Sequence, residues 1–257
     1  MYLNGFDGHC LRSRAFFPSV LGHLDMNDPV QVNSIKADFP DYRDKAKSPH
    51  FALQYGGSWK TLVVNCGFTE AEAKEMEANY HKLYAASDDW VSSKMDQASL
   101  DGYVTLAFGL RLRTPVLHKT ILGSRFTPAQ AAAESRSAGN AVSGQSYGLL
   151  NTRAGVEFYN RVINSPYRYE IHPIASIHDA LYYVIENRVE VVEWVNTNLI
   201  DCMRWQELPE LQHDVIKLNS ELDICYPTWA DPITIPNNLS AQEIYKLCQK
   251  ELTKRNQ

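Results

Sequence analysis

The stretch that decides the fold runs Arg43-Asp-Lys-Ala-Lys-Ser-Pro-His-Phe-Ala-Leu-Gln-Tyr55. Its Arg43, Lys47, Phe51 and Tyr55 recur every four residues. On a helix such residues form one slowly drifting stripe, in which each step rises about 6 Å. Two cations then lead into two aromatic rings. This order matches a ligand that presents phosphate charge followed by flat apolar surface.

An ordinary amphipathic helix is the alternative interpretation of this stripe, with solvated cations and aromatic rings in the core. On spacing alone, that alternative is the more common case. Gly56-Gly57 follows the stripe directly and predicts that the helix stops there. The spacing therefore needs support from other parts of the sequence.

Length and composition indicate a globular protein. The chain has 257 residues, of which 44% are hydrophobic and 11% aromatic, enough for one large or two small domains. No apolar run reaches the roughly 18 residues that span a bilayer, and no signal peptide is recognisable, which predicts a cytoplasmic protein without membrane contact. The five cysteines are scattered and predict reduced thiols, mostly in the core.

The net charge of -5 argues against nucleic-acid binding when the chain is taken as a whole. Its distribution is uneven, however. The segment 102–153 holds six basic residues and one acidic residue, Glu134, a local charge of +5. The basic residues are Arg111, Arg113, Lys119, Arg125, Arg136 and Arg153. A basic middle therefore lies between acidic flanks.

Helix and turn signals predict an α+β chain. Thr69-Glu-Ala-Glu72 forms a capping box that starts a long helix to about Gln97. Residues 102–114 alternate as in a β-hairpin, and 169–177 and 181–185 read as two strands around the turn 178–180. Further helices are expected at 7–24, 128–140, 146–164 and 189–208. The prolines of the C-terminal tail exclude one long element there.

Five segments together resemble family A DNA polymerases, in the order in which that family has them. The stripe followed by Gly56 resembles motif B, the fingers helix that binds the incoming nucleotide, here at about residues 41–56. The other four are Asp7-Gly-His9, the hairpin Gly102-Tyr-Val-Thr-Leu-Ala-Phe-Gly-Leu-Arg111, Arg136-x3-Asn140 followed by Gln145, and Ile177-His178-Asp179, which resembles motif C. The wording Phe-Ala-Leu-Gln-Tyr-Gly is close to phage members.

The resemblance implies a role for each matching residue. Asp179 would bind Mg2+ in a two-metal site, although a lone Asp in a turn is more often only turn chemistry. Lys47 and Arg43 would act on the triphosphate of the incoming dNTP, with His9 at its outer phosphates. The sugar and base would meet Phe51 and Tyr55. The template-primer DNA would contact Arg136, Asn140, Gln145 and His178.

Three departures from the family pattern carry structural expectations. Pro49 lies inside motif B, where it removes an N–H and meets the carbonyl of Lys45, so the helix is expected to kink or start afresh. Gln145 comes one residue late, because Gly144 stands at the family's glutamine position. The helix must therefore bulge if Gln145 is to take the role of the family's glutamine. Ala180 stands where the family usually has a glutamate after the metal-binding aspartate.

The fourth departure concerns motif A, which supplies the second metal carboxylate and precedes Asp-x-His in this family. Only six residues precede Asp7, and none is acidic. We therefore expect fingers at 1–125, a palm portion with motif C at 126–257, and activity only with a second polypeptide. That partner would carry motif A and the thumb, with or without a proofreading exonuclease, as in a divided phage polymerase.

Two other functions fit the same residues. A catalytically silent nucleic-acid-binding relic or scaffold of the same fold would explain Ala180 and Pro49, whereas the intact Asp179, Lys47 and Arg43 argue against it. A fragment of a single-subunit phage RNA polymerase would share the Arg, Lys, Tyr-Gly and His-Asp pattern. Phe51 and the sequence of the hairpin favour the DNA polymerase. A non-catalytic helical interaction protein is a more distant possibility.

Overall fold

The structure is a computed structural model that describes residues 2–123, 127–204, 208 and 212–255. It has the predicted α+β fold, in which helices predominate and each small sheet is a two-stranded antiparallel pair. The chain forms two compact units, Met1–Gln145 and Ser146–Gln257. This boundary falls inside a helical run. The assignment of 1–125 to fingers and 126–257 to palm stays a prediction.

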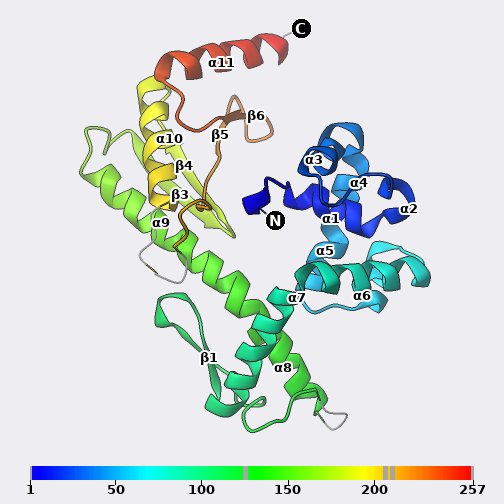
Figure 1. Cartoon of the computed structure of the whole chain (residues 1–257). Coiled ribbons are helices and arrows are strands. Elements are labelled where there is room, and N and C mark those ends of the chain that lie inside the picture. The colour runs from blue at the N-terminus through cyan, green and yellow to red at the C-terminus, as the bar shows by residue number, and fades with distance from the viewer. Residues whose placement is uncertain (1, 124–126, 205–207, 209–211, 256–257) are drawn as a thin grey trace. The chain divides into compact units, whose positions relative to one another are not determined.

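Short helices make up the first part of unit 1 (Figure 1). After the 3-10 turn Tyr2–Asn4 they are α1 (Gly8–Phe16), α2 (Pro18–Leu21), α3 (Pro29–Asp38), α4 (Pro40–Lys45), α5 (Lys47–Gln54) and α6 (Trp59–Cys66). Asp7 caps α1, accepting from the N–H groups of His9 and Cys10. The helix expected over 7–24 is two helices, because the chain leaves helical geometry at Phe17 before Pro18.

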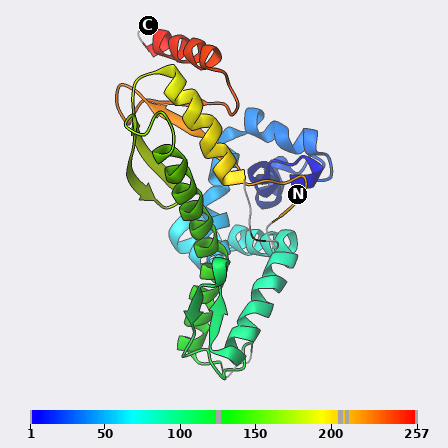
Figure 2. The same cartoon turned by 90° about the vertical axis from the view of Figure 1, so that its left-hand side faces the viewer.

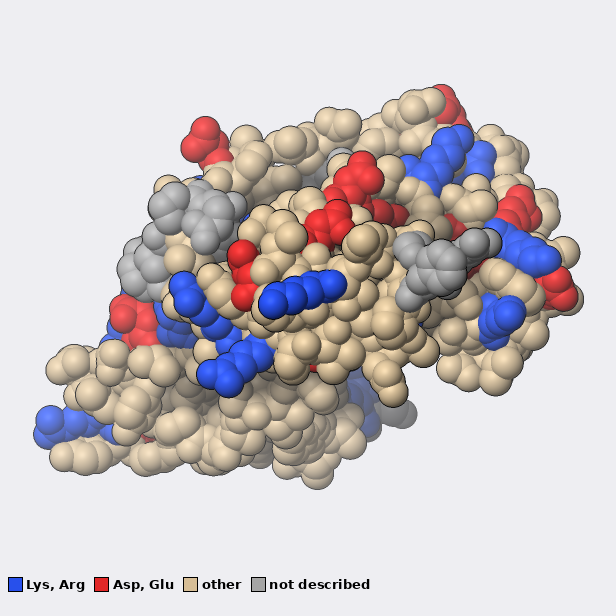
Figure 3. Space-filling model, turned by 90° about the horizontal axis from the view of Figure 1, so that it is seen from below, with Lys and Arg blue, Asp and Glu red and all other residues tan. Residues whose placement is uncertain are grey.

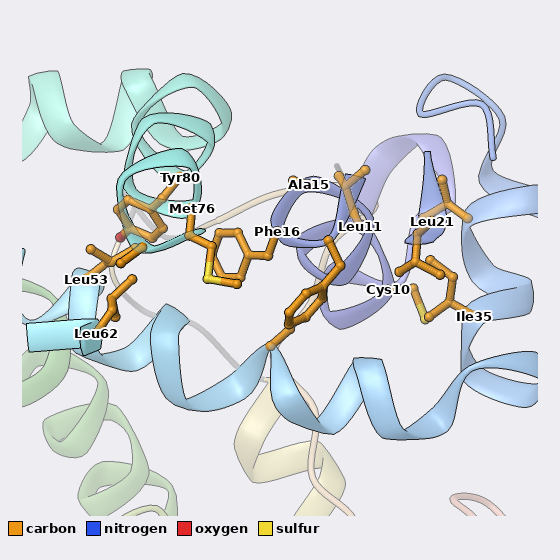
Figure 4. Close-up of a cluster of buried hydrophobic side chains, with 14 residues drawn as sticks. Cys10, Leu11, Ala15, Phe16, Leu21, Ile35, Leu53, Leu62, Met76 and Tyr80 are labelled. Atoms are coloured by element: carbon orange, nitrogen blue, oxygen red, sulfur yellow. The ribbon is translucent and has the colours of Figure 1, made fainter. Parts of the chain in front are cut away.

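The core of these helices is one cluster of buried apolar side chains (Figure 4). Phe16, Leu21 and Ile35 are among its most deeply buried members. Leu53 of α5 and Leu62 of α6 join it, together with Met76 and Tyr80 from the next helix. The back of α5 is thus anchored in the core, which leaves its opposite face available for the candidate site.

The long helix α7 (Glu70–Asp101) confirms the capping box at Thr69, whose hydroxyl accepts from the Glu72 N–H. It is kinked at Tyr84, where φ is -113° and ψ is 19°. Gly102 ends it in the left-handed conformation. The expected hairpin follows as β1 (Tyr103–Thr105) and β2 (Arg111–Arg113), joined through the 3-10 turn Ala107–Gly109.

Helix α8 (Ala129–Asn140) packs beside α7, as both cartoons show (Figures 1 and 2). It passes through one π-helical segment, Ala141–Gln145, into α9 (Ser146–Ile163). A π-helical turn inside an α-helix accommodates one extra residue. The bulge expected from the position of Gln145 is therefore confirmed, and it lies at the expected residues.

Unit 2 packs α9 and α10 (Val189–Arg204) against the antiparallel pair β3 (Ile171–Ile177) and β4 (Ala180–Ile185). Phe158 of α9 is fully buried and meets the Tyr183 ring edge-on at 5.1 Å. Leu181 lies against Gly155, where a Cβ would approach within 3.2 Å. Close packing on α9 thus supports the strand that follows the His-Asp turn.

The C-terminal tail holds structure that the sequence pattern did not predict. Its elements are β5 (Leu222–Cys225), β6 (Pro232–Ile235) and α11 (Ala241–Arg255). Asn196 of α10 is buried and donates to the Pro236 carbonyl at 3.0 Å, which ties the tail to α10.

All five cysteines are free, and two of them, Cys10 and Cys202, are buried. Among the described residues, no helix is long and apolar enough to cross a membrane.

Candidate functional site

The motif B segment is two helices that meet at Ala46. Pro49 is the third residue of α5, within the first turn, where a missing N–H leaves no intrahelical bond unmade. The helical hydrogen bonds begin again at His50, whose N–H donates to the Ala46 carbonyl at 3.2 Å. The helix starts afresh as expected, and Lys47 becomes the first residue of α5.

Both predicted cations are paired with carboxylates. Arg43 Nη2 lies 3.1 Å from Asp7 Oδ2, and Lys47 Nζ lies 2.8 Å from Asp44 Oδ1. Burial alone would raise the pKa of Asp7, but the Cys10 N–H, Arg43 and the His9 N–H together lower it. The Asp7 carboxylate is therefore ionised at neutral pH and holds Arg43 beside the start of α1.

The two aromatic residues of the stripe lie side by side and exposed. The rings of Phe51 and Tyr55 are stacked, with centroids 6.4 Å apart and planes inclined by 17°. Their exposed fractions are 46% and 55%, so neither ring belongs to the core. The alternative of an ordinary amphipathic helix required core aromatics and therefore fails at these two positions.

The end of α5 contacts the candidate DNA-tracking helix α8. Asn140 Nδ2 donates to the Tyr55 carbonyl at 3.3 Å. Gly56 has a φ of +76°, and a Cβ there would lie 3.0 Å from Cδ of Arg136. The stem of Arg136 thus rests against Gly56, where only glycine suits both the conformation and the space. Two motifs distant in the sequence meet at this point.

Gln145 ends the π-helical segment and is exposed. Four residues separate it from Asn140, against three in the family pattern. One extra residue in a helix would turn Gln145 by about 100° from the Asn140 face if the helix stayed regular. The π-helical turn absorbs this residue. Gln145 can therefore share a side of the helical run with Arg136 and Asn140.

Asp179 lies in a two-residue turn between Ile177 and Ala180, which pair as the last partners of β3 and β4. His178 takes the left-handed conformation with φ of 55°, as tight hairpin turns require. Both turn residues are exposed. Nearby Tyr147 has its pKa raised, chiefly by burial and further by the negative charge of Asp179. The turn thus exposes the Asp179 carboxylate near the Tyr147 phenol.

One described carboxylate, that of Asp179, is a candidate ligand for Mg2+. No group of three or more His, Cys, Asp or Glu side chains within them is placed to hold a metal ion. Mg2+ is commonly held by one or two protein carboxylates together with substrate phosphates and water. The exposed Asp179 carboxylate fits one such position, and a second carboxylate would have to be added.

Positive side chains follow the hairpin and α8. Arg111, Arg113, Lys119 and Arg136 are exposed, and the Arg111 guanidinium lies 4.4 Å from the Tyr103 ring centroid. Arg125 lies outside the described residues. On the face seen from below, Lys and Arg side chains are interspersed with Asp and Glu (Figure 3). A hollow of about 780 Å³ between α5, α7 and α8 is lined by Gly56, Trp90, Arg136 and Asn140, among others.

Sequence reasoning missed two buried polar residues behind the site, Arg12 and His50. Arg12 is 8% exposed and His50 is 7% exposed. The pKa of His50 is lowered to about 4, first by burial and then by the charges of Arg12 and His9. Arg12 lies outside the family motifs, and the spacing His9-x2-Arg12 on one turn of α1 was the available signal for it. His50 lies within motif B but not on its four-residue stripe, and no spacing signal pointed to it.

Comparisons with known proteins identify the family of the chain. The model of the family described as "DNA polymerase family A" matches residues 26–231, well over half of the chain. The chain therefore belongs to DNA polymerase family A. A similar solved structure is the polymerase domain of Pol1 from M. smegmatis in complex with DNA primer-template and dNTP. The two share 21% identity at a TM-score of 0.57, over 76% of this chain and 31% of that one, which indicates a shared fold.

Proposed function

We propose that this chain forms the fingers and the motif C part of the palm of a DNA-directed DNA polymerase. The enzyme would add dNTPs to a primer on template DNA. A second polypeptide would complete it with motif A and the thumb, with or without a proofreading exonuclease. The observation that carries the proposal is the contact between Tyr55 and Asn140, which joins the nucleotide-binding helix to the helix proposed to follow the DNA.

The triphosphate would bind where α1, α4 and α5 begin or end. Arg43 and Lys47 each hold a carboxylate already, at 3.1 and 2.8 Å, and phosphate oxygens are acceptors of the same kind. Lys47 is 43% exposed, so a phosphate can displace Asp44 from it at little cost. Lys47 would then lie by the leaving pyrophosphate and donate its proton.

The nucleoside would lie along the exposed ring pair. Phe51 would pack against the sugar, and Tyr55 would close the base pocket or stack on the template base. Arg136, Asn140 and Gln145 would contact the template-primer, in keeping with the exposed positions of Arg136 and Gln145 and the half-buried position of Asn140 on one helical run. His178 would lie against the primer terminus. The positive charge along 102–153 would neutralise DNA phosphates although the whole chain is acidic.

Asp179 would share the catalytic Mg2+ ions with the carboxylate of motif A. When bound, the two ions lower the barrier to phosphoryl transfer by stabilising charge on the attacking and leaving oxygens. The part of this chain is to present the Asp179 carboxylate from a tight turn whose flanking strand is packed on α9. One aspartate by itself cannot fix two octahedral ions.

Primer extension by the assembled enzyme tests the assignment of Asp179. Asp179→Asn should leave primer-template binding within about twofold and slow single-turnover extension by at least about 1000-fold, since an amide cannot replace the lost charge. Asp201→Asn, at an exposed position on α10, is the matched control and should behave as wild type. If Asp179→Asn stays within about tenfold, a barrier change of only about 1.4 kcal/mol, the assignment is wrong.

A further inference from the structure

Arg12 links the predicted phosphate-binding His9 to the kink of α7. Its Nη2 lies 2.7 Å from His9 Nδ1, and its Nη1 donates to the Tyr84 hydroxyl at 3.1 Å. Tyr84 is the residue at which α7 departs from helical geometry. Arg12 itself is almost fully buried. Its guanidinium is therefore held at both ends and lies behind His9, away from solvent.

The chemistry of this contact fixes the proton on His9. A guanidinium has five donors, no acceptor, and stays protonated in proteins. His9 Nδ1 must therefore accept, and the neutral ring then carries its proton on Nε2. Among the residues that the structure describes, Nε2 of His9 has no hydrogen-bond partner.

We propose that Arg12 is a positioning residue that fixes His9 as a neutral imidazole whose Nε2–H donates to a phosphate oxygen of the bound nucleoside triphosphate. The second half of this inference rests on the function proposed above. Arg12 does not touch the nucleotide. It acts through His9, by setting which ring nitrogen carries the proton and by limiting rotation of the ring.

The charges around His9 favour the neutral ring. Its pKa is lowered by burial, then by Arg12 and Arg43, and Lys47 acts in the same direction. Asp7 opposes them but is occupied by Arg43 and two backbone donors. The remaining charged or titratable neighbours are Asp44, which is paired with Lys47, and the buried His50. Arg43 and Lys47 thus supply the positive charge for a triphosphate, and His9 supplies a directed donor.

Nitrogen-15 NMR of the histidine rings tests the first half on the 257-residue chain alone. In the wild type at pH 7, His9 should be neutral and protonated on Nε2. In Arg12→Met, a folded variant should show a mixture of tautomers and a His9 pKa closer to 6.5. Arg14→Met is the matched control, because Arg14 lies on the same helix but donates to the Leu24 and Gly22 carbonyls. It should leave the His9 signal unchanged.

A wild-type His9 that is cationic at pH 7, or protonated on Nδ1, would overturn the inference even if Arg12→Met failed to fold. Tyr84→Phe offers a milder second variant, since it removes only the far partner of the guanidinium. It should leave the tautomer on Nε2 and increase the exchange broadening of the His9 ring signal. An identical His9 spectrum in folded Arg12→Met and wild type would also contradict the proposal.

Titration with inorganic tripolyphosphate and Mg2+ tests the second half. The Gln amide nitrogen can take the place of Nε2 and the Asn amide nitrogen that of Nδ1. His9→Gln should therefore bind within about threefold of wild type, while His9→Asn and Arg12→Met lose about tenfold. Equal losses in the Gln and Asn variants would overturn the Nε2 assignment. If the wild type binds no tripolyphosphate while its His9 has the Nε2 proton, the proposed function fails and the tautomer assignment stands.

Discussion

Deletion of Gly144 is the change whose outcome follows most directly from the structure. The deletion restores the spacing of three residues between Asn140 and the glutamine that follows it. If the π-helical segment Ala141–Gln145 is a one-residue insertion, the shortened run should close into regular α-helix. The flanking helices α8 and α9 should then keep their own buried faces.

The magnitude comes from what Gly144 does and does not touch. A Cβ built at Gly144 would have no atom within 4 Å, so its removal breaks no packing. Glycine in a helix interior is about 1 kcal/mol less favourable than alanine. We therefore expect the deletion variant to be as stable as wild type or more stable by about 1 kcal/mol. That corresponds to about 2–4 °C in melting temperature for a chain of this size.

Deletion of Thr152 is the matched control, one exposed residue removed from a regular turn of α9. Everything after it would rotate by about 100° and carry Ala154, Phe158 and Val162 out of their core. Loss of the buried Phe158 alone costs about 3–5 kcal/mol, a large part of the 5–15 kcal/mol that stabilises a typical domain.

Melting curves followed by circular dichroism and by near-ultraviolet absorbance distinguish the two deletions. The Thr152 deletion should abolish the cooperative transition of unit 2, and the Gly144 deletion should preserve it. If both deletions lower the melting temperature equally, the π-helical segment is not a tolerated insertion and the account of Gln145 is wrong.

Two further predictions concern α5. Phe51→Tyr in the assembled polymerase should raise dideoxynucleotide incorporation at least about tenfold with little change for normal dNTPs, since the added hydroxyl can replace the hydrogen bond of the missing 3'-hydroxyl. Primer extension measures the ratio of dideoxynucleotide to dNTP incorporation. An unchanged ratio would show that Phe51 does not contact the sugar. His50 has a pKa of about 4 when folded and about 6.5 when unfolded, so the unfolded chain binds more protons and stability falls by about 3 kcal/mol as pH drops from 6.5 to 4. Urea denaturation should show this loss in the wild type and a flatter profile in His50→Gln; parallel profiles would contradict it.

The local signals of the sequence were sufficient where geometry follows from a few neighbouring residues. The capping box at Thr69, the stop at Gly56, the restart of the helix around Pro49 and the bulge before Gln145 were all predicted and confirmed. Each is a constraint on backbone hydrogen bonds or on φ, which a residue type determines within one turn.

Other features depended on contacts between distant segments and were not predictable. The chain segment after the hairpin of β5 and β6 is hydrogen-bonded to α10 through the buried Asn196, and no local sequence pattern predicts this contact. The break at Phe17 was missed because Pro18 fits the first turn of a second helix as well as it interrupts the first. Arg12 and Tyr84 are 72 residues apart, so their contact exists only in the fold.

The candidate site was chosen as a set of residues because the five motifs fall in family order, and the roles of these residues stay a prediction. Its electrostatic state was not predictable. The sequence presented Arg43 and Lys47 as cations available to a ligand, whereas the structure pairs them with Asp7 and Asp44. The sequence does not show which carboxylate pairs with which cation, because the pairing depends on the positions of the side chains in the fold.

Template-directed extension by the chain, alone and reconstituted, tests the central claim most directly. The purified 257-residue protein should give no detectable extension of a primer on template DNA with Mg2+ or Mn2+, and extension should appear when a polypeptide bearing motif A is added. Asp179→Asn in the same mixture should abolish it and so exclude a contaminating polymerase. Robust extension by the isolated chain would contradict the account, because some carboxylate within these residues would then have taken the role of motif A.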